Sequence, residues 1–230
     1  MNNASLELGG TNWAEKDGNI LGYSVGDTSG KYSPQEFTFA RGSNLSATRI
    51  DRAGLIVKGR ENQLLQSNQF DTTWVNSNTT ETGGQSGYDG SNNAWLLEKT
   101  ATAYASIYQS TTITGVYTFS VYAKQGTLST MTLRDGSNQR AIFNLSNGSV
   151  SSTAGSPVNA SIISVGVNGW YRCSITMTTS TPLLQIYPNW NQATAGNIYI
   201  QDAQLEQGLV ATSVIETGAS TAQAGILEDL

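Results

Sequence analysis

The segment "IYPNWNQ" (residues 186–192) has the residue types of a sugar-binding loop. Tyr187 and Trp190 bracket a Pro-Asn turn, and Asn189 and Asn191 flank the tryptophan. Sugar sites stack the apolar face of a ring on an aromatic side chain and bind its hydroxyl groups with amides. A tryptophan in a turn, without strand alternation around it, is hard to bury. These residues are therefore glycan-binding candidates. The alternative is that Trp190 folds over the end of the domain as a plug.

The loop "ETGGQSGYDGSNNAW" (residues 81–95) is a second candidate. Tyr88 lies in its glycine-rich part and is a further candidate for contact with a glycan. Asp89, together with backbone carbonyls, is a candidate ligand set for Ca²⁺, a hard cation that takes oxygen ligands from loops. Calcium-binding loops usually supply several carboxylates, so a simple turn is the stronger interpretation of Asp89. We expect no other cofactor.

Groups that could perform catalysis are sparse. The sequence has no histidine, which excludes Ser-His and Cys-His mechanisms and histidine-ligated metals. The single cysteine, Cys173, falls on the core-facing side of a predicted strand and is expected to be buried. Asp202 and Glu206 lie on a predicted strand and loop, and nothing in the sequence indicates the pair of carboxylates, about 5–10 Å apart, that a glycosidase needs. We therefore expect no enzymatic activity.

The charge pattern limits the partners. The chain has 12 Lys and Arg against 17 Asp and Glu, and its basic residues are scattered, which disfavours nucleic acid. No apolar run is long enough to cross a membrane, and the N-terminus lacks a signal-peptide pattern, so folding in a cytoplasm is expected. Only 13% of residues are charged, against about 25% in typical domains. The expected surface is neutral and polar, as in β proteins of secreted or virion origin.

Short alternating runs between Leu64 and Ile215 predict an all-β fold. Asn147-Gly148 is a strong signal for a hairpin turn. The run 170–177 places Tyr171, Cys173, Ile175 and Met177 on one face, with Trp170 on the opposite parity at the strand's first position. We predict a two-sheet jelly-roll sandwich over residues 61–216, with strands that include 116–123, 140–145, 170–177 and 197–205, and with a hairpin turn inside 145–152.

The two ends of the chain differ from this middle part. Residues 1–60 contain many glycines and too few apolar residues for a core of their own, so we expect an extended, little-structured segment. Such a segment gains most by burying its apolar pieces between chains, which favours a homotrimer. Residues 217–230 have the composition of a linker, after which we expect further chain.

Five motifs in order carry a family resemblance: "ENQLLQSNQFDTTW", "YTFSVYAKQG", "FNLSNGSV", "NGWYRCSITM" and "IYIQDAQLEQGLVATSVIET". Together they resemble the carbohydrate-binding-module-like jelly roll of bacteriophage virion proteins, especially tail and head fibres. The resemblance covers about residues 61–217 and implies that Trp170 belongs to the frame of the module. It supplies no ligand, because the aromatic platform varies within the family.

Residues 6–57, which end in "ATRIDRAGLIV", are similar to the leader segments of such fibre proteins. The resemblance implies that residues 1–60 attach the chain to tail, collar or capsid proteins, that the fibre is a homotrimer, and that it is made in the host cytoplasm and exposed on the virion. It leaves three hypotheses open. The jelly roll binds host-surface polysaccharide or decorates the particle, it is a purely structural connector, or it is the accessory module of a glycan-degrading enzyme.

Overall fold

The computed structural model describes residues 60–166, 168–179 and 183–223, together with five short strands within residues 1–59. Two compact units are distinguished, Met1–Leu45 with Gly225–Leu230, and Ser46–Ala224. In the first unit, β1 (Ala14–Lys16), β2 (Asn19–Ser24) and β3 (Ser33–Glu36) form an antiparallel sheet. In the second, β4 (Arg49–Ile50) pairs with β5 (Ile56–Val57). The predicted anchoring role concerns residues 1–60, which mostly lie outside the described ranges, and it stays a prediction.

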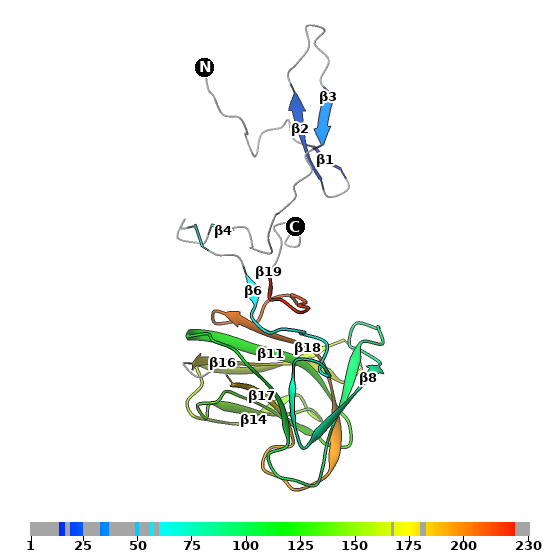
Figure 1. Ribbon diagram of the computed structural model, residues 1–230, viewed down its shortest axis with the longest axis vertical. Coiled ribbons are helices and arrows are strands. Elements are labelled where there is room, and N and C mark those ends of the chain that lie inside the picture. Colours follow the sequence, from blue (N-terminus) through cyan, green and yellow to red (C-terminus); the bar gives the residue numbers. More distant parts are fainter. Residues whose placement is uncertain are drawn as a thin grey trace. The chain divides into compact units, whose positions relative to one another are not determined.

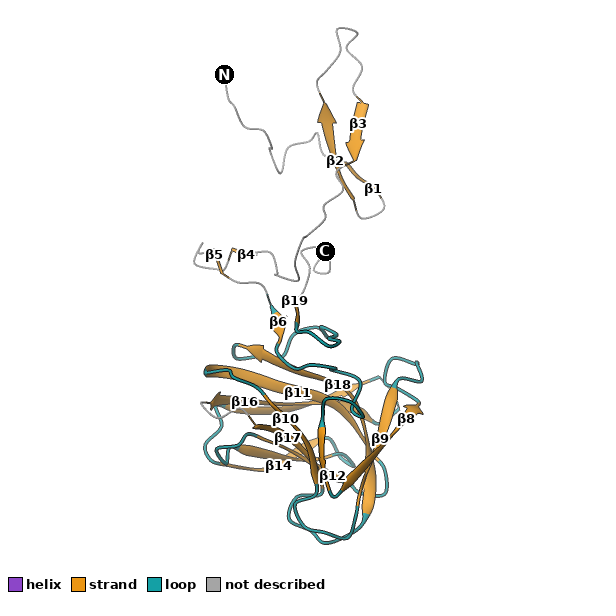
Figure 2. Ribbon diagram, viewed as in Figure 1, coloured by secondary structure: helices purple, strands orange, loops and turns teal. Residues whose placement is uncertain are grey.

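The second unit is a sandwich of two antiparallel six-stranded sheets, and its described residues contain no helix (Figures 1 and 2). This confirms the predicted fold. The first sheet, called the β12 sheet, has the order β14 (Ser149–Ala154), β13 (Arg140–Asn144), β12 (Thr130–Arg134), β17 (Leu183–Pro188), β10 (Ser106–Ser110) and β7 (Val75–Ser77). The second, the β11 sheet, has the order β15 (Asn159–Val165), β16 (Trp170–Thr179), β11 (Gly115–Gln125), β18 (Gly196–Gln207), β9 (Ala94–Lys99) and β8 (Thr79–Gln85).

The core lies between the two sheets and is built by the alternation that the sequence predicts. Phe119 and Val121 of β11 are fully buried, and they face Met131 and Phe143 of the β12 sheet within one hydrophobic cluster. Each such side chain contributes about 1.5–3 kcal/mol when it leaves water. Cys173 is in the same cluster, as predicted, and burial raises the pKa of its thiol, which disfavours the reactive thiolate.

The predicted hairpin at Asn147-Gly148 joins β13 to β14. Gly148 has a left-handed φ of 68°, and a Cβ at this position would lie 2.5 Å from a ring carbon of Tyr171. Both the backbone conformation and the close approach of the ring therefore require glycine.

The outer face of the β11 sheet is also buried, which the alternation does not predict. Trp170 is 1% exposed and Tyr122 8% exposed, in a second cluster with Ala94 that is separate from the core. The Tyr88 ring covers this cluster by stacking on Tyr122, with ring centroids 3.8 Å apart and planes inclined by 8°. Trp170 is thus part of the frame, as the resemblance implies.

Residues 208–217, here called the C-terminal strap, cover another part of the same outer face. Thr118 donates its hydroxyl to the Gly208 carbonyl oxygen at 2.9 Å, and the Ile215 N–H donates to the Gln204 side chain at 2.7 Å. Polar side chains of the sheet thereby satisfy the backbone of a segment that has no strand partner of its own.

Hydrogen bonding to the sandwich continues past residue 216. The Gln66 N–H donates to the Gly218 carbonyl oxygen at 2.8 Å, and β19 (Ala222–Gln223) pairs with β6 (Glu61–Asn62). Part of the segment assigned to a linker therefore packs as a strand against the start of the sandwich.

Candidate functional site

The predicted residues 187–191 come together where β17 ends. Tyr187 is 5% exposed and contacts the half-buried Trp190, with ring centroids 4.7 Å apart and planes inclined by 83°. Asn189 and Asn191 have left-handed φ values of 58° and 56°, which asparagine tolerates. The Thr130 hydroxyl and the Asn189 amide oxygen are hydrogen-bonded at 3.1 Å, whereas Asn191 is exposed. Tyr187 and Asn189 therefore support the turn, and Trp190 and Asn191 are the members accessible to a ligand.

Three residues that the sequence analysis missed complete this group, called the Trp190 cluster. The Tyr104 ring centroid lies 4.8 Å from that of Trp190, and the guanidinium carbons of Arg134 and Arg140 lie 5.6 and 5.0 Å from it. Tyr104 is 49% exposed and has a left-handed φ of 61°. Such a conformation is strained for a bulky residue, and strain of this kind concentrates at functional sites.

The two arginines are direct cross-strand partners of β12 and β13. Like charges placed opposite each other destabilise a sheet. Among the described residues neither guanidinium forms an ion pair. Each donates instead to a neutral amide oxygen, Arg134 to that of Gln185 and Arg140 to that of Asn138. The buried Nε of Arg134 has no acceptor among the residues that the structure describes. The cluster therefore carries two positive charges beside an aromatic ring, and no described carboxylate forms an ion pair with them, although the net charge of the chain is −5.

The structure does not bring Tyr88 to the Trp190 cluster. Tyr88 packs on the outer face of the β11 sheet, and its hydroxyl donates to Asp202 Oδ2 at 2.8 Å. Asp89 Oδ1 accepts hydrogen bonds from the N–H and the hydroxyl of Ser91, at 3.0 and 2.7 Å, so it closes a turn. Within the described ranges no three acidic or cysteine side chains are placed to hold a metal ion. Ca²⁺ binding at Asp89 stays a prediction.

Asp202 lies at a bulge of β18, with a left-handed φ of 49° and 3% of its surface exposed. Its Oδ1 is buried and accepts no hydrogen bond from any described residue. Burial raises the pKa of this carboxyl to about 6; the Tyr88 hydrogen bond opposes the rise, and the negative charges of Glu216 and Asp89 add to it. Glu206 has both oxygens bound by Thr212 of the C-terminal strap. Its role is to hold the strap.

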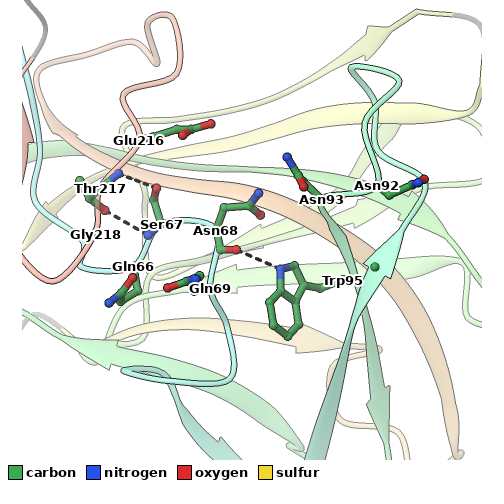
Figure 3. Close-up of a pocket in the computed structure, with 11 residues that line it drawn as sticks. Gln66, Ser67, Asn68, Gln69, Asn92, Asn93, Trp95, Glu216, Thr217 and Gly218 are labelled. Carbon is green, nitrogen blue, oxygen red and sulfur yellow. Dashed lines mark hydrogen bonds between the residues drawn. The ribbon is translucent and has the colours of Figure 1, made fainter.

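A cleft of about 620 Å³ lies between the chain at residues 66–69, the loop before β9 and the end of the strap (Figure 3). We call it the amide cleft, because five of its lining residues carry carboxamides and surround the half-buried Trp95: Gln66, Asn68, Gln69, Asn92 and Asn93. Trp95 Nε1 donates to the Asn68 carbonyl oxygen at 2.9 Å. Glu216 is the one charged residue in the lining.

The fold defines the class: a two-sheet antiparallel β-sandwich, which carries aromatic and amide side chains at two places on its surface. No protein-family model and no curated protein sequence matches the chain. No helix in the described part is suited to cross a membrane.

Two solved structures show distant similarity. One contains the CBM22-1 and GH10 modules of Clostridium thermocellum endo-1,4-β-D-xylanase 10B in complex with xylohexaose, with 13% identity and a TM-score of 0.38. The other is the enzymatically active domain of tailspike protein 4 from bacteriophage CBA120, with 15% identity and a TM-score of 0.37. The alignments cover 67% and 65% of this chain but only 30% and 21% of those chains. At these scores the similarities assign neither a family nor a ligand.

Proposed function

We propose that this chain is a structural fibre protein of a bacteriophage virion, whose jelly roll binds host-surface glycans at the Trp190 cluster. In this proposal residues 1–60 attach the chain to the particle, the fibre is a homotrimer, and the protein has no catalytic activity. The ordered sequence motifs support the assignment to a virion. The observation that supports glycan binding is that two guanidiniums, which form no ion pair with any described residue, converge on the half-buried Trp190 ring.

The chemistry of the cluster favours an acidic polysaccharide. The exposed Tyr104 ring and the half-buried Trp190 ring offer apolar surface to a sugar face. Arg134 and Arg140 present forked donors that match carboxylate, sulfate or phosphate groups, and an anion between them would relieve their mutual repulsion. Because Tyr187 and Asn189 already fix the turn, little conformational entropy is lost on binding.

Replacing Trp190 with alanine is expected to weaken binding of an acidic polysaccharide at least about tenfold, since it removes both the stacking surface and the site at which the guanidiniums converge. Arg140→Gln is expected to weaken binding and to reduce its dependence on salt. Titration calorimetry on the full chain, after a screen of acidic and neutral glycans, measures both effects.

Lys124→Gln is the matched control, because Lys124 lies over the Tyr199 ring, 5.9 Å from its centroid, and is not part of the cluster. It should leave affinity unchanged. A blank glycan screen, or equal affinities for Trp190→Ala and the parent chain, would contradict the proposed glycan binding.

A connector role is the second candidate, and exposed apolar side chains favour it. Val158 and Leu209 lie close together, because both are hydrogen-bonded to Thr176. The Val158 N–H donates to the Thr176 carbonyl oxygen, and the Thr176 hydroxyl donates to the Leu209 carbonyl oxygen. Val158, Leu209 and the adjacent Val210 are 53%, 61% and 67% exposed. Loss of trimer assembly in Leu209→Ser and Val210→Ser, with unchanged glycan binding, would assign this surface to subunit contact. A monomer found by light scattering for the parent chain would contradict the trimer.

A further inference from the structure

We propose that the amide cleft is a second ligand site, which takes an uncharged oligosaccharide independently of the Trp190 cluster. The inference goes beyond the proposed function and does not rest on it. The cleft is formed by residues of the β11 sheet and of the two segments that precede and follow the sandwich, whereas the Trp190 cluster lies on the β12 sheet.

The lining presents hydrogen-bonding groups that the fold itself does not use. The side-chain amides of Gln69, Asn92 and Asn93 make no hydrogen bond with the described residues, and all three side chains are exposed. Figure 3 shows these amides around the same opening as the Trp95 ring. Each carboxamide offers donors and acceptors together, as does each sugar hydroxyl group.

The Trp95 ring supplies the apolar surface that a sugar face needs. It is held in place from several sides: Nε1 is bonded to the Asn68 carbonyl oxygen, the Phe70 ring packs edge-on with centroids 6.1 Å apart, and a Cβ at Gly83 would lie 3.3 Å from the ring. A stacking surface that is fixed before binding loses little entropy on binding.

The walls of the cleft are also fixed. The Asp202 N–H donates to Asn68 Oδ1 at 3.3 Å, and the N–H groups of Ser67 and Thr217 each donate to the other's hydroxyl, at 3.0 and 2.9 Å. The cleft therefore exists without a ligand, and its volume of about 620 Å³ lies within the range of small-molecule sites.

Charge separates the ligand of this cleft from that of the Trp190 cluster. None of the described residues that line the cleft is a cation, and the Glu216 carboxylate repels anions and accepts hydrogen bonds from hydroxyl groups. An acidic sugar would therefore be disfavoured here, and an uncharged one favoured.

The test is titration of the full chain with uncharged oligosaccharides of hexose, pentose and N-acetylhexosamine units. A double variant, Gln69→Ala with Asn92→Ala, should weaken binding about tenfold or more, since it removes two of the amides. Asn159→Ala is the matched control, because Asn159 is an exposed asparagine on β15 outside the cleft, and it should bind as the parent does. Side-chain amide signals of Asn92 and Asn93 should shift in NMR spectra on addition of the sugar.

Two outcomes would overturn the inference: no uncharged sugar binds at millimolar concentration, or the double variant binds as well as the parent. Trp190→Ala should leave binding in the cleft intact. If uncharged sugars bind, and Trp190→Ala abolishes their binding whereas the cleft double variant does not, the cleft is not the site, although the proposed function stands. If only the cleft variants lose binding, the inference stands and the Trp190 cluster is not required.

Discussion

Replacing Asn62 with alanine is expected to lower the free energy of unfolding by about 3–5 kcal/mol. Asn62 is fully buried at the start of the sandwich, and its Nδ2 donates to the carbonyl oxygens of Ala203 and Ile215 at 3.1 and 2.9 Å. Its Oδ1 accepts from the N–H groups of Leu64 and Leu205 at 3.1 and 3.0 Å. One side chain thus joins the first residues of the domain to β18 and to the C-terminal strap. The alanine variant leaves four buried backbone groups without these partners, each at a cost of about 1–3 kcal/mol before relaxation.

Urea denaturation followed by tryptophan fluorescence measures this loss. Asn92→Ala is the matched control, because Asn92 is exposed and its side chain makes no hydrogen bond in the described part of the chain. It should change stability by no more than about 0.5 kcal/mol. Asn62→Asp keeps both acceptor bonds but turns a carboxylate toward the Ala203 and Ile215 carbonyl oxygens. It should be at least as destabilising at neutral pH. If Asn62→Ala lowers the free energy of unfolding by less than about 1 kcal/mol, the hydrogen bonds of Asn62 do not hold the C-terminal strap.

The strands of the core could be predicted from the sequence because alternation reports which side chains face the other sheet. Phe119, Val121, Cys173 and Ile175 follow that rule without exception. By the same rule Tyr122, whose parity is opposite to that of Phe119 and Val121, should face outward, yet the structure buries it beneath the Tyr88 ring. Alternation describes one strand at a time, so it carries no information about a distant loop or strap that covers the outer side.

The candidate site was predicted only in part for a similar reason. Trp190 was found because its local composition is unusual for a strand. Arg134 and Arg140 were missed, although the short turn "DGSNQ" between them makes them cross-strand partners once the hairpin is recognised. The position of Tyr104 beside Trp190 depends on the pairing of β10 with β17. These strands are far apart in the sequence, so no local pattern predicts that they pair. The amide cleft joins the loop 81–95, which the sequence did single out, to residues 66–69 and 216–218 at the two ends of the domain, and no local pattern indicates that these come together.

Replacing Asp202 with asparagine is expected to stabilise the protein by about 2–3 kcal/mol at pH 7.5 and to remove part of its pH dependence. The pKa of the Asp202 carboxyl is raised from 3.8 to about 6 by burial, with the Glu216 and Asp89 charges adding to the rise. Between about pH 4 and pH 6 the folded protein therefore binds more protons here than the unfolded chain does. The contribution of this group to stability is thus greatest at low pH and falls as the pH rises through 6, because an ionised carboxylate is then held in a buried site.

Asparagine suits this position because it tolerates the left-handed φ of 49° and its amide oxygen can still accept the Tyr88 hydroxyl. Denaturation curves for the parent and Asp202→Asn, measured from pH 3.5 to pH 8, should therefore lie close together at the acid end, diverge between about pH 4 and pH 6, and run parallel above it. Tyr88→Phe supplies the companion test. The Tyr88 hydrogen bond lowers the pKa of Asp202, so removing it should raise that pKa further and move the separation to higher pH. Parallel curves for the parent and Asp202→Asn over the whole range would show that Asp202 keeps an ordinary pKa, and that the bulge of β18 holds its carboxylate in contact with water.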